Sequence, residues 1–216
     1  MYALIQREIR DHRVFFMGPV ILSAVLIGLS ISTLDSHPTL DSHRWIEAAI
    51  FDSGAGVIVL PIIVLGFFAM GAVQMYTDRI RRISAFVSTL SVSRNRILLA
   101  KIIAGVLAIL ASIVPLAVTV TILLRIHAPP VPIFSVMVLE IFAGTFLVTL
   151  ACYCIGLQAG WNSGRLAPAL GGLGLTCILV TLILIKGFAP EIVVILSAFI
   201  VASLTRTWHL FTSTSL

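Results

Sequence analysis

The chain has 216 residues, of which 59% are hydrophobic and 11% are charged, and its formal net charge is +5. A soluble domain carries about 25% charged residues, and it would not hide this much apolar surface from water. The composition therefore excludes an ordinary soluble domain and predicts one membrane-embedded domain over residues 1–216. The basic residues stand in short segments between apolar runs, without an aromatic-interleaved basic surface, so we expect no nucleic-acid partner.

The first thirteen residues, MYALIQREIRDHR, predict a short amphipathic helix. Met1, Leu4, Ile5 and Ile9 share one helical face, and the Arg residues fall largely elsewhere. Such a helix lies in the membrane interface with its apolar face toward the acyl chains. The alternative is an ordinary positive flank that only fixes the orientation of the first span.

Six apolar runs follow, and a helix that crosses the hydrocarbon core needs about 20 apolar residues. The runs cover residues 14–34, 49–76, 97–124, 133–159, 166–185 and 190–205. The last run is the shortest. The predicted fold class is an all-α integral membrane protein with six transmembrane helices, preceded by the interfacial helix.

The distribution of Lys and Arg predicts the orientation of these spans. With the N-terminus in the cytoplasm, eleven of the fourteen basic residues lie on the cytoplasmic side, and only Arg44, Arg125 and Lys186 lie outside. Six spans return the C-terminus to the cytoplasm. We therefore expect a multi-pass protein of the cytoplasmic membrane with both termini inside.

Two kinds of residue within the spans indicate how the helices pack and bend. Gly156, Gly160 and Gly164 repeat every four residues, which places them on one helical face and predicts close packing against a neighbouring helix. Pro61 and Pro115 each remove a backbone hydrogen bond, so we expect a kink in the second and the third span. Such kinks are structural in many proteins and shape a path or a hinge in others.

Glu140 is the acidic residue that lies well inside an apolar run, SVMVLEIFAG. Carboxylates within a membrane are costly and are candidates for a functional role, here in a translocation path or in gating. The competing interpretation is a structural hydrogen bond to a neighbouring helix. The three cysteines and the polar loop at residues 35–48 match no metal-ligand spacing, so we expect no metal site.

The segment from Thr77 to Lys101, TDRIRRISAFVSTLSVSRNRILLAK, concentrates positive charge between the second and third spans. Apolar residues at spacings of three and four over 80–90 predict a short amphipathic helix that Thr77 or Asp78 caps. We expect Arg94, Arg96 and Lys101 to flank the third span and to reach the interface by snorkelling. Charge that only fixes orientation does not require the helix, so the pattern favours an element that docks a cytoplasmic partner.

This segment resembles the cytoplasmic loop of the membrane subunits of ABC type-2 exporters. The likeness rests on the acidic-Arg pair Asp78-Arg79, the turn LSVSR at 90–94 and the apolar run ILLAK at 97–101. Ser84 and Ser91 stand where the family often has glycine and proline. The resemblance implies a coupling helix that contacts an ATPase. The residues that it assigns to this contact are Asp78, Arg79, Arg81, Arg82, Phe86, Leu90, Ser93 and Arg94.

The resemblance also implies partners, because the chain has no Gly-Lys-Ser/Thr phosphate-binding loop of its own. ATP and Mg would bind to two copies of a separate ATPase subunit, and a second copy of the permease would complete a homodimer in the lipid bilayer. The chain itself is expected to be neither an enzyme nor a cofactor-binding protein. The alternatives are a transporter or channel driven by an ion gradient through Glu140, and a membrane scaffold subunit.

Overall fold

The computed structural model describes residues 55–80, 94–127, 132–161, 166–186 and 190–213, and eight single helical positions between Gln6 and Gly28. The five continuous stretches are all α-helices. They are α4 (Ala55–Ile80), α6 (Arg94–His127), α7 (Pro132–Trp161), α8 (Leu166–Lys186) and α9 (Pro190–Ser213). The described part of the chain therefore has the predicted all-α fold class.

Four of these helices are long and apolar enough to cross a membrane. Their apolar windows are Pro61–Asp78 in α4, Asn95–Thr119 in α6, Leu139–Trp161 in α7 and Glu191–Phe211 in α9. In α8 the apolar window is the shorter stretch Leu170–Thr181. The architecture is that of a multi-pass helical membrane protein. Most of the predicted interfacial helix at 1–13 and most of the predicted first span at 14–34 lie outside the described residues.

Two helices continue past the predicted ends of their spans. The second run was expected to end at residue 76, but α4 continues to Ile80, so Thr77 and Asp78 lie inside a helix and do not cap a new one. The last run was expected to end at residue 205, but α9 continues to Ser213. Hydropathy falls at these points, yet helical hydrogen bonding does not depend on the polarity of the side chain.

Hydroxyl side chains explain how polar residues fit into such apolar helices. Many of them donate a hydrogen bond to the carbonyl oxygen four residues earlier in the same helix, so that they need no partner on another helix. Thr149 donates to the carbonyl of Thr145, Thr176 to that of Gly172 and Thr207 to that of Ser203, at 2.7–2.9 Å. A Ser or Thr within an apolar run therefore does not by itself predict a polar partner on a neighbouring helix.

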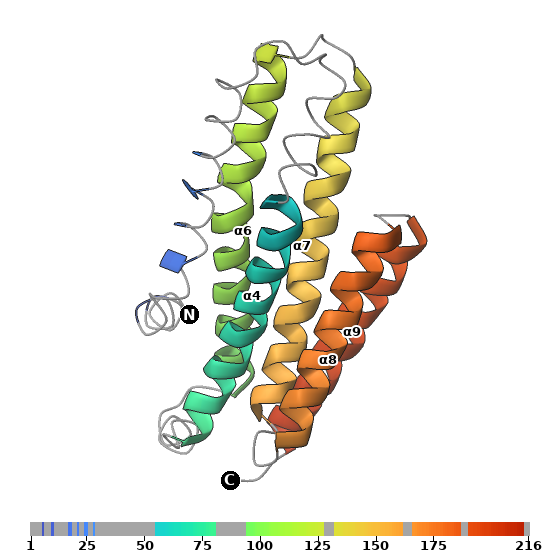
Figure 1. Cartoon of the computed structure of the whole chain (residues 1–216). Coiled ribbons are helices and arrows are strands. Elements are labelled where there is room, and N and C mark those ends of the chain that lie inside the picture. Colours follow the sequence, from blue (N-terminus) through green and yellow to red (C-terminus); the bar gives the residue numbers. More distant parts are fainter. Residues whose placement is uncertain are drawn as a thin grey trace.

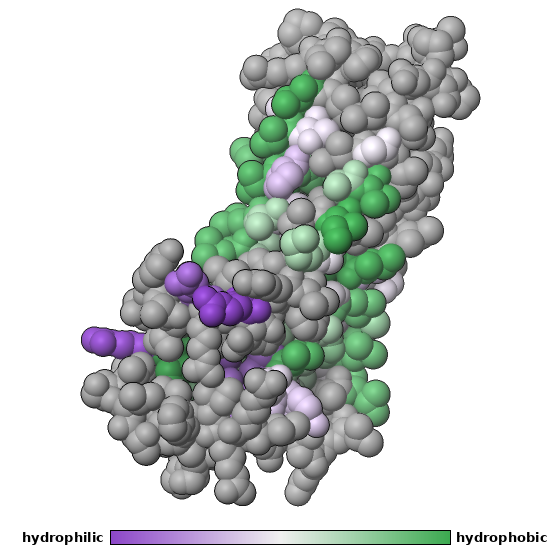
Figure 2. Space-filling view, turned by 90° about the vertical axis from the view of Figure 1, so that its left-hand side faces the viewer, coloured by the Kyte–Doolittle hydropathy of each residue, from purple (hydrophilic) through white to green (hydrophobic). Residues whose placement is uncertain are grey.

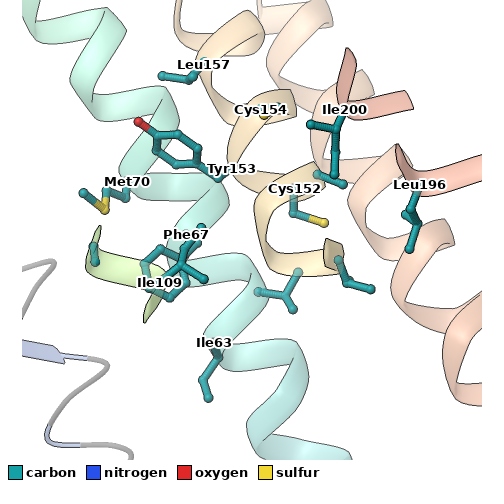
Figure 3. Packing of buried hydrophobic residues seen from close by; sticks show 14 of the residues in the cluster. Ile63, Phe67, Met70, Ile109, Cys152, Tyr153, Cys154, Leu157, Leu196 and Ile200 are labelled. Atoms are coloured by element: carbon teal, nitrogen blue, oxygen red, sulfur yellow. The ribbon is translucent and has the colours of Figure 1, made fainter. Parts of the chain in front are cut away.

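The helix α7 is the centre of the bundle. Every residue from Val148 to Leu157 is buried except Leu150, which is half-buried. The helices α4 and α6 lie on one side of α7, and α8 and α9 lie on the other (Figure 1). The largest contact between two described helices joins α4 and α7. Figure 3 shows Phe67 and Met70 of α4 on one side of this core and Leu196 and Ile200 of α9 on the other.

The helices alternate in direction along the chain. Phe68 and Ala72 of α4 lie against Gly156 and Gly160 of α7, so that these two helices run parallel. Gln158 of α7 donates a hydrogen bond to Ser203, and Trp161 packs on Phe211 further along, so that α9 is parallel to α7 as well (Figure 1). As a result α4, α7 and α9 end, and α6 and α8 begin, at one end of the bundle, which we call the junction end (Figure 1).

The outer surfaces of the helices are largely apolar. Leu139, Ile178 and Val194 expose 61–70% of their surface, and hydrophobic side chains make up much of the coloured, described surface in Figure 2. A soluble protein rarely exposes an apolar surface of this extent, whereas acyl chains solvate it without cost. The exposed surface therefore agrees with the membrane location that the composition indicates.

Candidate functional site

A cluster of polar side chains is buried near the junction end. It consists of Gln74 and Asp78 on α4, Lys101 on α6 and Tyr153 on α7, and we call it the polar junction. Gln74 and Asp78 are four residues apart and therefore share one face of α4. Lys101, Gln74 and Tyr153 expose 0% of their surface and Asp78 exposes 7%, so the cluster is an interior feature that holds three helices together.

An ion pair joins α4 to α6 at this point. The Lys101 Nζ lies 3.1 Å from the Asp78 Oδ2 and donates a longer hydrogen bond of 3.5 Å to the Gln74 carbonyl oxygen. The electrostatic attraction between the two opposite charges offsets the free-energy cost of removing both from water. Removal of one partner from such a pair costs about 3–5 kcal/mol, because it leaves the other charge uncompensated.

The Tyr153 hydroxyl links α7 to both other helices. It lies 2.7 Å from the Gln74 Oε1 and 2.9 Å from the Lys101 carbonyl oxygen, and it donates toward both acceptors with its single proton. A Cβ atom at Gly105 would collide with the Tyr153 ring. The absence of a side chain at Gly105 thus makes the space in which the aromatic ring reaches across to α4 and α6.

One polar atom of the polar junction has no hydrogen-bond partner among the described residues. It is the Gln74 Nε2, which is buried. An unsatisfied buried donor costs about 1–3 kcal/mol. The Gln74 side chain therefore contributes to the junction through its Oε1 and its backbone carbonyl, while its amide nitrogen is a local penalty.

The glycines of α7 bring its backbone into direct contact with α4. A Cβ at Gly156 would collide with the carbonyl oxygen of Phe68, and a Cβ at Gly160 with that of Ala72. From the other helix, a Cβ at Gly71 would lie 2.5 Å from the carbonyl oxygen of Tyr153. Small residues of this kind let two helices approach closely. The pair α4 and α7 therefore packs as one tight unit beside the polar junction.

The structure gives different positions to the residues assigned to ATPase coupling. Asp78 is buried and paired with Lys101, so its carboxylate faces inward. Arg79 belongs to α4, and Arg94 is the first residue of α6. The expectation that Lys101 snorkels to the interface is wrong, because Asp78 holds its ammonium group inside the bundle. The remaining candidates, Arg81, Arg82, Phe86, Leu90 and Ser93, lie outside the described residues.

The candidates for a path or for gating are not part of the polar junction. Glu140 is exposed on α7, and its carboxylate makes no hydrogen bond or ion pair with the part of the chain that the structure describes. Pro61 lies half-buried in α4, and Pro115 is exposed in α6. Gly164, the third predicted packing glycine, lies outside the described residues. Within the described helices, no three His, Cys, Asp or Glu side chains gather as metal ligands would.

Sequence reasoning missed Gln74, Tyr153 and Gly105. Gln74 and Lys101 are polar residues near the ends of apolar runs, and such residues usually face the interior of a helical bundle and pair there. The spacing of Gln74 and Asp78 could have marked one polar stripe on α4. Tyr153 and Gly105 gave no signal, because a tyrosine and a glycine in an apolar run acquire a role only from the helix that lies opposite.

Comparison of the chain with protein-family models, with curated proteins and with solved structures found no match.

Proposed function

We propose that this chain is the membrane-spanning permease subunit of an ATP-driven ABC exporter. In this proposal six transmembrane helices form one half of the translocator, and a second copy completes it. Two separate ATPase subunits dock on the cytoplasmic segment between α4 and α6. ATP binding draws them together, and the resulting movement rearranges the two bundles about their interface.

The observation that carries this proposal is the pairing of the two ends of the resembling segment. The likeness to the coupling loop begins at Asp78 and ends at Lys101, and these two residues form the buried ion pair. A contact between its first and last charged residues ties together the two helices, α4 and α6, from which the segment extends. A positive flank that only fixes membrane orientation has no need of such a closure.

The location of the basic residues supports the proposed orientation. Arg79 is near the end of α4, Arg94 and Arg96 are at the start of α6, and Arg206 is near the end of α9, all toward the junction end. Lys186 ends α8 at the opposite end. An excess of Arg and Lys is typical of the cytoplasmic side, so the junction end is the face on which we propose that the ATPases bind.

Affinity purification of the detergent-solubilised full-length chain from its native membrane tests the proposal. We expect an ATPase subunit that carries a Gly-Lys-Ser/Thr loop to co-purify with the chain, and the complex to hydrolyse ATP. Reversal of charge at Arg81 and Arg82 to Glu should abolish co-purification, whereas the exposed Arg206→Glu on α9 serves as the matched control. Recovery of the chain without any ATPase would contradict the proposal.

The same preparation separates this function from ion-driven transport. A carrier that uses Glu140 would lose activity in the Glu140→Gln variant and keep it without an ATPase. An exporter of the proposed kind should retain ATPase binding and ATP hydrolysis in Glu140→Gln, because that carboxylate has no partner in the described helices. Transport that proceeds without an ATPase, and that is lost in Glu140→Gln but kept after charge reversal at Arg81 and Arg82, would favour the ion-driven alternative.

A further inference from the structure

We propose that the Asp78–Lys101 ion pair and Tyr153 form a latch that holds α6 to the rigid α4–α7 unit, and that movement at the α4–α6 connection reaches the bundle by displacing this latch. The coupling part of this inference rests on the proposed function. The latch itself is a property of the described helices, so it can be tested without any partner.

The first step is that α4 and α7 move as one body. Gly156 and Gly160 bring the backbone of α7 against the carbonyl oxygens of Phe68 and Ala72, and Gly71 does the same from α4. Contacts between backbones cannot be relieved by a change of side-chain rotamer. Sliding or tilting of one helix relative to the other would therefore break several contacts at once.

The second step is that α6 is joined to this body in a different way. Apolar residues of α6 pack into the core, but its contacts with α4 and with α7 are each much smaller than the contact between α4 and α7. The specific bonds that the described residues provide are the Asp78–Lys101 ion pair and the hydrogen bonds at Gln74 and Tyr153. Directional polar bonds on flexible side chains can be exchanged for others, whereas interlocked backbones cannot.

The third step is the position of the latch. Asp78 is two residues before the end of α4, and Lys101 is seven residues after the start of α6. Residues 81–93 are joined covalently to the two helix ends that this ion pair ties together. Figure 3 shows Tyr153 on the side of α7 that faces α4, opposite Leu196 and Ile200 of α9. A change in the latch is thus transmitted to the central helix.

An ion pair, unlike an apolar contact, can break and form again with other partners, and this property suits a contact that opens and closes. Hydrophobic residues of similar size often hold a fold together as well as a buried ion pair does. They would hold α6 in place, but they provide no alternative set of bonds. The unpartnered Gln74 Nε2, whose cost the fold tolerates, is one donor that can take part in a rearranged set.

Pulsed EPR on the full-length chain tests the latch. Nitroxide labels go on cysteines introduced at Tyr76 of α4 and Asn95 of α6, which are both exposed. The exposed Cys177 is replaced by Ser, and Cys152 and Cys154 stay because they are buried. The test variant is Asp78→Asn/Lys101→Gln, which removes both charges of the ion pair together. Its matched control is Arg96→Gln, an exposed cation on the same helix.

We expect the label-to-label distance distribution to broaden and to shift in the double variant and to stay unchanged in Arg96→Gln. The exchange Asp78→Lys/Lys101→Asp should restore the narrow distribution, because it keeps an ion pair at the same place. A native distance distribution in the double variant would contradict the latch but not the proposed function. Failure to find an ATPase would contradict the proposed function but not the latch.

The second arm uses the complex with its co-purified ATPase and a non-hydrolysable ATP analogue with Mg. In the native chain we expect the analogue to shift the distance between the labels. In the double variant we expect the ATPase to remain bound and this shift to be lost. A nucleotide-dependent shift that survives in the double variant, or is absent from the native complex, would refute the role of the latch in coupling.

Discussion

Substitution of Gly156 by Ala tests the close approach of α4 and α7. The added Cβ would collide with the carbonyl oxygen of Phe68, a backbone atom that moves only with its helix. Overpacking of this kind costs about 1–3 kcal/mol. Replacement of glycine by alanine in a helix also stabilises by about 0.4–1 kcal/mol, because it restricts the unfolded chain. The expected net loss in the free energy of unfolding lies between about 0 and 2.6 kcal/mol.

The control for this substitution is Gly66→Ala on α4, where a Cβ would meet nothing within 4 Å. It carries the same gain in helix stability without the collision, so the difference between the two variants isolates the packing. A difference of about 1–3 kcal/mol corresponds to about 2–12 °C in unfolding temperature for a chain of this length. The measurement is the fraction of monodisperse protein after heating in detergent. Equal unfolding temperatures for the two variants would refute the argument.

Three further substitutions test the polar contacts by the same heating assay. Tyr153→Phe should lower the free energy of unfolding by about 1–3 kcal/mol, since it leaves the Gln74 Oε1 unpaired; native stability would contradict this. Gln74→Met should change stability by less than about 1 kcal/mol, because it removes a donor that is already unsatisfied while the Lys101 carbonyl keeps the tyrosine hydroxyl bonded. Ser203→Ala should cost about 0.6 kcal/mol and Gln158→Met more, because the Gln158 amide donates to both the hydroxyl and the backbone oxygen of Ser203. Equal losses at these two positions would show that the backbone acceptor adds nothing.

The polar junction changes the interpretation of the basic segment between α4 and α6. From the sequence, Asp78 belongs to a surface for a partner and Lys101 to a membrane flank. In the structure these two residues neutralise each other inside the bundle. The carboxylate of Asp78 is therefore not part of the surface that we propose for the ATPase, and the other residues assigned to that contact remain a prediction. The two ends of the segment act as its attachment to the bundle.

Comparison of the predicted apolar runs with the helices shows that hydropathy located the helices better than it located their ends. The runs at 97–124 and 133–159 agree within three residues with α6 and α7 at both ends. The runs ending at 76 and 205 stop at the first polar residues, whereas α4 and α9 continue to Ile80 and Ser213. Hydropathy detects where acyl chains solvate a helix, and the backbone continues its hydrogen bonds beyond that region.

The amino-acid sequence by itself determined that this is a helical membrane protein, because the free energy of burying apolar side chains depends on composition and run length alone. It also placed Gly156 and Gly160 on one face, since helical periodicity is a local property. Only the tertiary structure decided that this face meets Phe68 and Ala72, and that Asp78 and Lys101 form a pair across 22 intervening residues. Which residue compensates a buried charge depends on the helix that packs beside it, and no local pattern specifies that neighbour.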